Sequence, residues 1–145
     1  MESWRDTAST DAQADLDELF NAVLPLAEQH LARYGEFFPF GAALSADGQV
    51  KILGGDPGQG ERPQSQAVLD VLYQGAREDG SAHRAAAFVA DVLAEGVDAV
   101  RVELEHREGN VLTILVPYSR SRLKRAITFG QMRVSAGQAR VWGVR

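Results

Sequence analysis

The sequence predicts an α+β protein: a helix, a β-hairpin, a second helix and three or four further strands, with the helices packed on one mostly antiparallel sheet. Three observations support this fold class. Apolar residues recur at helical spacing over residues 11–34. A turn pair divides two strand-like runs over residues 37–53, and two further strand patterns cover residues 100–107 and 111–118.

The first predicted helix follows a polar N-terminus. Residues 1–9 offer nothing to bury and are predicted to be a disordered or frayed end. Thr10 is a candidate N-cap, and the helical pattern over residues 11–34 ends at Gly35. Pro25 lacks an N–H and its ring clashes with the preceding turn, so we expect a kink or a break at this position.

The predicted hairpin has two unlike arms. Residues 37–44 are almost continuously apolar and should form a central strand. In the second arm Val50 and Ile52 alternate with polar residues, which is typical of a strand nearer an edge. Asp47 and Gly48 both tolerate positive φ, so they predict a type I′ turn between the arms.

The middle of the chain contains a loop, a helix and an ambiguous segment. Residues 54–60 are rich in glycine but lack the Lys and Ser or Thr of a phosphate-binding loop. A helix is predicted over residues 63–78, with one apolar stripe formed by Val68, Leu69, Leu72, Tyr73 and Ala76. The periodicity of residues 84–95 fits both a helix and a strand. We predict a strand because it completes the sheet, with support from a resemblance described below.

Two clearer strands follow. Residues 100–107 alternate strictly between two faces, and residues 111–118 are almost continuously apolar, as expected of a central strand that ends at Pro117. A three-residue loop at 108–110 would pair His106 with Leu112, Leu104 with Ile114 and Val102 with Val116.

The C-terminal part of the chain completes the predicted sheet. A last strand is expected from Ile127 to Val134, ending near Gly137. The apolar residues 141–144 are expected to dock on the rest of the protein. Together these elements predict one domain over residues 10–145 that includes a basic C-terminal segment, residues 119–145.

Composition restricts the cellular setting and the chemistry. The 145 residues include no cysteine, so the chain has no disulfide and no thiol nucleophile. No secretory signal is recognisable, and no apolar run is long enough to span a bilayer. We therefore expect a cytoplasmic protein without a membrane partner.

The formal net charge of −5 conceals a sharp division along the chain. Residues 1–108 contain all 20 acidic residues and 8 of the 15 basic ones, whereas residues 109–145 contain the other basic residues and no acidic residue. Such asymmetry can mark a surface for an oppositely charged partner. The simplest interpretation is that the basic segment packs against the acidic front of its own chain or of a neighbouring subunit.

The candidate binding residues are the four cations Arg120, Arg122, Lys124 and Arg125. They could neutralise several phosphates or contact an acidic protein surface. Because no aromatic residue alternates with them and the chain is acidic overall, a nucleic-acid partner is disfavoured. A protein partner, or a second copy of the chain, is expected instead.

The sequence predicts no catalytic residue, metal site or cofactor. Glu103 and Glu105 share a strand face, but the flanking Arg101 and Arg107 favour a charge-balanced, solvated face over acid–base chemistry. His106 points to the opposite face, so it cannot join the two glutamates as a metal ligand on a regular strand.

Three phrases together resemble a family of small uncharacterised bacterial proteins: Glu36-Phe37-Phe38-Pro39-Phe40-Gly41, Pro63-Gln64-Ser65-Gln66, and Asp98-Ala99-Val100 through Glu105-His106 with Val116-Pro117-Tyr118. This resemblance implies a fold and no particular activity. The element order is also similar to roadblock and profilin-like domains, whose antiparallel sheet serves as a docking or dimerisation platform. This chain departs from them by replacing the usual terminal helix with a basic, β-rich tail.

Three classes of function fit these observations. The first is a non-catalytic protein-interaction module, with a homodimer as one form. The second is an acidic immunity or antitoxin-like protein that binds a basic toxin. The third is an enzyme or small-molecule sensor with a pocket between the sheet and the first long helix.

Overall fold

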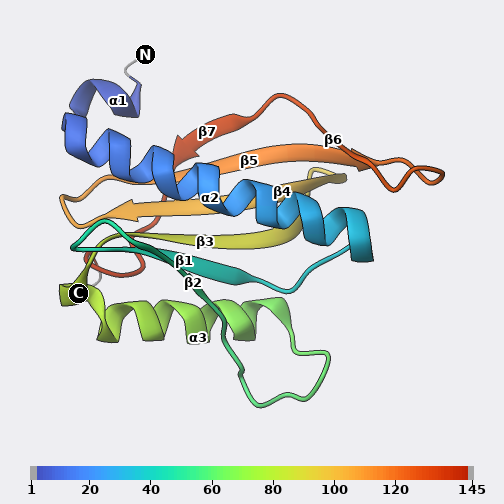
Figure 1. Cartoon of the computed structure of the whole chain (residues 1–145), viewed down its shortest axis with the longest axis horizontal. Helices are drawn as coiled ribbons and strands as arrows, with labels where there is room; N and C mark the ends of the chain where they lie inside the picture. Colours follow the sequence, from blue (N-terminus) through green and yellow to red (C-terminus); the bar gives the residue numbers. More distant parts are fainter. Residues whose placement is uncertain (1–2, 144–145) are drawn as a thin grey trace.

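The computed structural model describes residues 3–143 and confirms the α+β class with an antiparallel sheet (Figure 1). Two helices of more than ten residues, two short helical turns and seven strands make up this part of the chain. In order they are α1 (Trp4–Thr7), α2 (Thr10–Tyr34), β1 (Phe40–Ser45), β2 (Val50–Leu53), α3 (Ser65–Glu78), the 3₁₀ turn η1 (Gly80–Ala82), β3 (His83–Ala94), β4 (Val97–His106), β5 (Val111–Arg120), β6 (Ile127–Phe129) and β7 (Arg133–Ala136).

All neighbouring strands run antiparallel, in the order β2-β1-β3-β4-β5-β6. The strand β5 has two partners on its outer side: residues 112–115 pair with β7, and residues 118–120 pair with β6. As predicted, β1 is internal and β2 is an edge strand. The sheet curls around α2, which lies across one face, while α3 lies against the other (Figure 1).

Burial on both faces of β3 explains why residues 84–95 could not be assigned by periodicity. Ala85, Ala87 and Val89 belong to the core beneath α2, whereas the alternate residues Phe88 and Ala90 belong to the core beneath α3. A strand covered on both faces is apolar throughout and loses the period-2 signal. The predicted strand is confirmed. The predicted stripe on α3 is also confirmed, since all five of its residues are buried.

The helix α2 begins and ends close to its predicted limits. Its N-cap is Ser9, one residue before the predicted Thr10, and the Ser9 hydroxyl accepts a hydrogen bond from the backbone N–H of Ala12 at 3.0 Å. Gly35 closes the helix with φ at 80°, a conformation that glycine adopts without strain. The helix continues through Pro25 without a break, because packing of its apolar face outweighs one lost hydrogen bond.

The prediction of a frayed N-terminus is wrong for residues 4–7, which form α1. Ser3 caps this helical turn, and its own N–H donates to the Asp6 carboxylate at 2.9 Å, in a reciprocal capping box. Trp4 packs against the core beneath α2. Residues 1 and 2 lie outside the described residues.

Two hairpin loops have the same form, and both differ from the predicted turns. Gly48 has φ at 88° and Asp47 does not have positive φ, so the turn is not type I′. Instead, the Gly48 N–H donates to the Ser45 carbonyl at 3.0 Å, in a three-residue loop that ends in a left-handed glycine. Gly109 occupies the equivalent position between β4 and β5, with φ at 106° and a hydrogen bond to the His106 carbonyl.

This second loop covers residues 107–109 rather than 108–110, so the predicted register is wrong by two residues. Leu104 pairs with Leu112 and Val102 pairs with Ile114. Because side chains alternate with a period of two, a shift of two leaves each side chain on its predicted face. The predicted apolar face is therefore present with different partners.

The chain after Pro117 also differs from the prediction. The strand β5 runs on to Arg120, and the Pro117 carbonyl accepts a hydrogen bond from the Gly130 N–H at 2.7 Å. The single strand predicted over residues 127–134 is divided into β6 and β7. Val141 is 8% exposed and docks beneath α3, as expected for the apolar C-terminal residues; Val144 lies outside the described residues. None of the described helices combines the length and apolar character needed to cross a bilayer.

Two glycine substitutions should change stability in opposite directions. A Cβ at Gly137 would lie 2.8 Å from backbone atoms of Leu112, so Gly137→Ala should destabilise the protein by about 1–3 kcal/mol. A Cβ at Gly75, inside α3, meets nothing within 4 Å apart from the adjoining residues and backbone of its own helix, so Gly75→Ala should stabilise the protein by about 1 kcal/mol. Urea unfolding of both variants checks this. Equal midpoints would contradict the close approach of β7 to β5.

Candidate functional site

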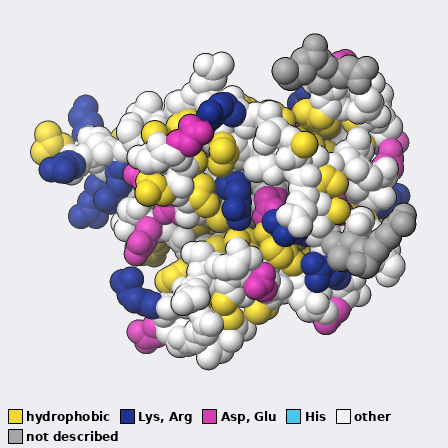
Figure 2. Space-filling view, turned by 180° about the vertical axis from the view of Figure 1, so that it is seen from behind, with side chains coloured by type: hydrophobic (Ala, Val, Ile, Leu, Met, Phe, Trp, Pro, Cys, Tyr) yellow, Lys and Arg dark blue, Asp and Glu magenta, His cyan; other side chains and the backbone are white. Residues whose placement is uncertain are grey.

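The predicted binding residues lie at the end of the β5–β6 hairpin, which projects from the body of the protein (Figure 1). We call residues 119–126 the hairpin tip. All eight are exposed, and Leu123 is 96% exposed. Lys and Arg side chains gather on this projection, at the left of Figure 2. The predicted binding residues therefore lie on a surface that the fold presents to solvent.

The four predicted cations do not behave alike. Arg120 extends back to the body, where its Nη2 donates to the Ala32 carbonyl at 3.2 Å, near the C-terminal end of α2. A cation is favourable there because the last helical carbonyls carry partial negative charge. Arg122, Lys124 and Arg125 form no ion pair with any residue in the described part of the chain. Three of the four cations thus remain available for a partner.

Local hydrogen bonds give the hairpin tip a defined shape. The Arg125 N–H donates to the Ser121 carbonyl at 2.9 Å, and the Ser121 N–H donates to the Ala126 carbonyl at 2.9 Å. Arg125 has φ at 53°, a conformation that few residues other than glycine adopt. The backbone of the hairpin tip is therefore a closed turn. The positions from which its cationic side chains project are defined before a partner binds.

The prediction that Glu103 and Glu105 lie on a solvated face is wrong. Glu103 is 6% exposed and Glu105 is 3% exposed, because residues 138–143 fold over this face of β4. We call residues 138–143 the C-terminal strap. The helix α3 packs on β1 and β3 and leaves this part of β4 for the strap to cover. The strict alternation of β4 revealed its two faces but not that both are buried.

The Glu105 carboxylate is bound by four successive backbone N–H groups of the C-terminal strap. Arg140 and Val141 donate to Oε1 at 2.6 and 2.9 Å, and Trp142 and Gly143 donate to Oε2 at 2.9 and 3.2 Å. Successive amides that converge on one anion form a concave binding site. Here the anion is a side chain of the same protein, so the strap is held by a structural contact.

Glu103 holds the same strap through side chains. It accepts hydrogen bonds from the Tyr73 hydroxyl and from Nε of Arg140, the latter at 3.0 Å. Burial, together with the bond to Glu103, raises the pKa of Tyr73, which therefore stays protonated and donates. The Arg140 guanidinium lies 4.6 Å above the Tyr73 ring. At this place the basic segment does pack against acidic residues of its own chain, as the charge division suggested.

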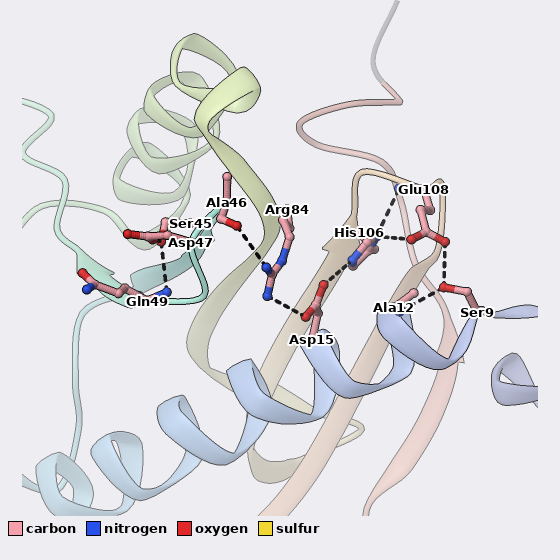
Figure 3. A network of polar contacts seen from close by, with 10 residues as sticks. All are labelled: Ser9, Ala12, Asp15, Ser45, Ala46, Asp47, Gln49, Arg84, His106 and Glu108. Carbon is pink, nitrogen blue, oxygen red and sulfur yellow. Dashed lines mark hydrogen bonds and ion pairs between the residues drawn. The ribbon is translucent and has the colours of Figure 1, made fainter.

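A second buried network joins α2 to the two hairpin loops (Figure 3). Asp15 accepts from Nε2 of His106 at 2.8 Å and from Nη2 of Arg84 at 3.0 Å, and Arg84 also donates to the Ala46 carbonyl. The backbone N–H of Glu108 donates to Nδ1 of His106 at 3.1 Å. Because an N–H can only donate, Nδ1 is unprotonated and Nε2 carries the proton.

The position of the proton on His106 determines whether Asp15 and His106 can act together in acid–base catalysis. Both ring nitrogens of His106 are engaged, and the ring is 1% exposed, so it has no free nitrogen with which to deprotonate a substrate. Ser9, whose hydroxyl belongs to the same network, donates to Glu108 and caps α2. The arrangement therefore fixes the start of α2 on the sheet. The sequence gives one indication that Asp15 is buried: it immediately precedes Leu16, which lies on the buried stripe of α2.

Parts of the three phrases that carried the family resemblance meet at the other end of the sheet. The Tyr118 hydroxyl donates to Asp91 of β3 at 2.6 Å, and Asp91 lines a cavity of about 150 Å³ with Phe37 and Ser65. Burial raises the pKa of Asp91, against the opposing effect of the hydrogen bond from Tyr118. Residues distant in sequence thus come together around Asp91. This aspartate is a candidate functional residue that the sequence did not indicate.

No metal site emerges from these clusters: within residues 3–143, no three His, Cys, Asp or Glu side chains are placed to hold a metal ion together. The polar groups at the strap bind one another, and those around Asp15 form a second, separate network.

Glu105→Gln should loosen the C-terminal strap. An amide NH₂ would face backbone N–H groups that now donate to a carboxylate, so we expect a loss of about 2–3 kcal/mol in unfolding free energy. Hydrogen exchange of the amides of residues 140–143 should accelerate together. Glu95→Gln is the matched control, because the Glu95 side chain is 83% exposed. Unchanged exchange in Glu105→Gln would contradict the four-amide contact.

Asp91→Asn should change the pH dependence of stability. A raised carboxyl pKa means that the folded state favours the neutral form, so the wild-type protein loses this contribution as the pH rises through the folded pKa above 3.8. The amide that replaces the carboxyl group does not titrate. The variant should therefore gain stability relative to the wild type between about pH 3 and about pH 7. Urea unfolding across that range gives the difference, and a difference of opposite slope would refute the assignment.

Comparison with protein-family models, with curated proteins and with solved structures finds no match to this chain in any of the three.

Proposed function

We propose that this protein is a non-catalytic interaction module that binds an acidic protein surface through its hairpin tip. One observation carries the proposal: Arg122, Lys124 and Arg125 surround the 96% exposed Leu123 and form no ion pair within the described chain. Other basic residues of the same segment, Arg133 and Arg140, are paired with acidic residues of the protein. Among the described residues of the segment, the unpaired cations are thus concentrated on a hairpin that projects into solvent (Figure 1).

The chemistry of the tip favours a protein partner. Cations on a projecting turn attract an acidic surface and accelerate encounter, and an exposed leucine among them can enter an apolar depression on the partner. The tip contains no aromatic residue on which a nucleic-acid base could stack, and the chain as a whole carries a net charge of −5. Both features disfavour a polyanion such as DNA or RNA.

The protein itself exposes unpaired carboxylates that such a tip could bind. Asp11, Glu18 and Glu28 are exposed on α2 and form no ion pair with any described residue. A second copy of the chain is therefore the first partner to test. In that arrangement the hairpin tip of one copy would lie on α2 of the other.

The test compares Arg122→Glu/Lys124→Glu with Lys51→Glu/Arg62→Glu. Both double variants change the net charge equally, but Lys51 and Arg62 are exposed far from the tip in sequence and lie on β2 and in the following loop. Sedimentation across protein concentration at about 50 mM and about 500 mM salt measures self-association, because screening is strong only at the higher value. Fluorescence anisotropy of a labelled oligoglutamate peptide and of a labelled DNA duplex measures binding to external acidic partners.

The proposal expects self-association or binding to the peptide that weakens at high salt, weakens in the tip variant and persists in the control. Reversal of two of the three unpaired cations should weaken binding about tenfold or more, which corresponds to about 1.4 kcal/mol or more. A monomer that binds neither probe at low salt would refute the proposal. Equal weakening in both variants, or tighter binding to DNA than to the peptide, would also refute it.

A further inference from the structure

A cavity of about 880 Å³ lies between α2 and the outer strands β5 and β7, with α1 at one end. Its apolar lining includes Trp4, Phe20, Leu104, Leu112, Ile114 and Val134. Leu104, Leu112 and Ile114 are at most 6% exposed and belong to the core beneath α2, so core side chains form the floor. The volume falls in the range of cavities that hold small organic ligands, roughly 300–1,000 Å³.

The course of α2 explains why this space is left open. The helix packs on β1, β3, β4 and β6, but it does not lie along β7, which pairs with the start of β5. Met132 and Val134 of this outer region are 45% and 48% exposed, although the residues that form the floor of the cavity are buried. The curled sheet therefore presents an apolar concave surface beside the first half of α2.

From these features we infer that the cavity binds a neutral, predominantly apolar small molecule. Among the described residues of its lining, the charged side chains are Arg5 and Asp17, which already bind each other through two parallel hydrogen bonds of 3.0 and 2.7 Å. A charged ligand would have to separate this pair or leave its own charge in solvent. The lining therefore selects against ions of either sign.

Two neutral polar groups can orient such a ligand. The indole N–H of Trp4 donates to no residue within the described chain. Asn21 also lines the cavity, and its side-chain amide, whose oxygen can accept a hydrogen bond, is bonded to no residue within the described chain. One donor and one acceptor beside an apolar wall fit a molecule with a hydroxyl or amide at one end. An aliphatic alcohol is the simplest compound of this class.

This inference is independent of the proposed protein contact, because the lining of the cavity includes no residue of the hairpin tip and none of the acidic residues Asp11, Glu18 and Glu28 of α2. The two can therefore fail separately. The variant Arg122→Glu/Lys124→Glu should bind the small molecule as the wild type does.

The chain offers an internal reporter of the site. Of its two tryptophans, Trp4 lines the cavity, whereas Trp142 packs against α3 on the opposite face of the sheet. A long-chain alcohol with a terminal bromine quenches tryptophan fluorescence on contact. In Trp142→Phe, where only Trp4 emits, this probe should quench the fluorescence in a saturable manner. In Trp4→Phe, where only Trp142 emits, it should not.

A cavity-filling variant and a matched control complete the experiment. Val134→Trp would fill the space from β7, and Ile52→Trp places the same side chain on β2, where Ile52 is 52% exposed. Binding of the unbrominated alcohol is measured by calorimetry in both variants and the wild type. Val134→Trp should weaken binding about tenfold or more, and Ile52→Trp should leave it unchanged. The carboxylate of the same chain length should bind about tenfold more weakly than the alcohol.

Each outcome decides the inference. Saturable quenching of Trp4 alone, with loss of binding in Val134→Trp and preference for the alcohol, supports it. Equal quenching of both tryptophans, equal binding by alcohol and carboxylate, or no binding by the wild type would overturn it. The cavity could instead be filled by a second copy of the chain, and sedimentation with and without the alcohol tests this. A dimer that dissociates on addition of the alcohol would assign the cavity to that copy and overturn the inference.

Discussion

The architecture depends on the burial of two carboxylates in a central strand. A charge in the interior is strongly unfavourable unless hydrogen bonds replace the lost water. Glu105 receives four backbone N–H groups, and Glu103 receives Tyr73 and Arg140. The bonds from the C-terminal strap can form only when it crosses β4. The part of the second face that α3 leaves open is therefore covered by irregular chain, and the glutamates determine where that chain lies.

Local patterns were sufficient for most of the fold. The stripe on α3, the long α2 and the strands β1, β4 and β5 follow from periodicity, because each keeps one face or all of itself buried. The errors arise where tertiary contacts decide. Sequence spacing alone did not place the loop at 107–109, since a shift of two residues preserves the alternation. Pro25 stayed within α2 because packing along the whole helix outweighs a local defect.

The candidate functional surfaces also differ in whether local sequence or tertiary contacts determine them. The hairpin tip was predictable because four cations within six residues belong in solvent, even though Leu123 lies among them. The roles of Glu103 and Glu105 were not, because their partners in the strap lie 35 or more residues later in the chain. Nothing in the strand itself shows that a distant segment will cover it. The cavity beside α2 depends on how far the sheet curls, which is likewise a property of the assembled strands.

The contact between β4 and the C-terminal strap also has a consequence for the order of folding. The ladder from β3 to β5 is formed by residues 83–120, so these strands can pair before residues 140–143 reach β4. During that interval Glu103 and Glu105 have no strap amides or Arg140 to bind and must keep their water. This part of the sheet face thus stays hydrated until the strap has docked on β4. Closure of the second core is therefore a late step in folding, although the ladder can form earlier.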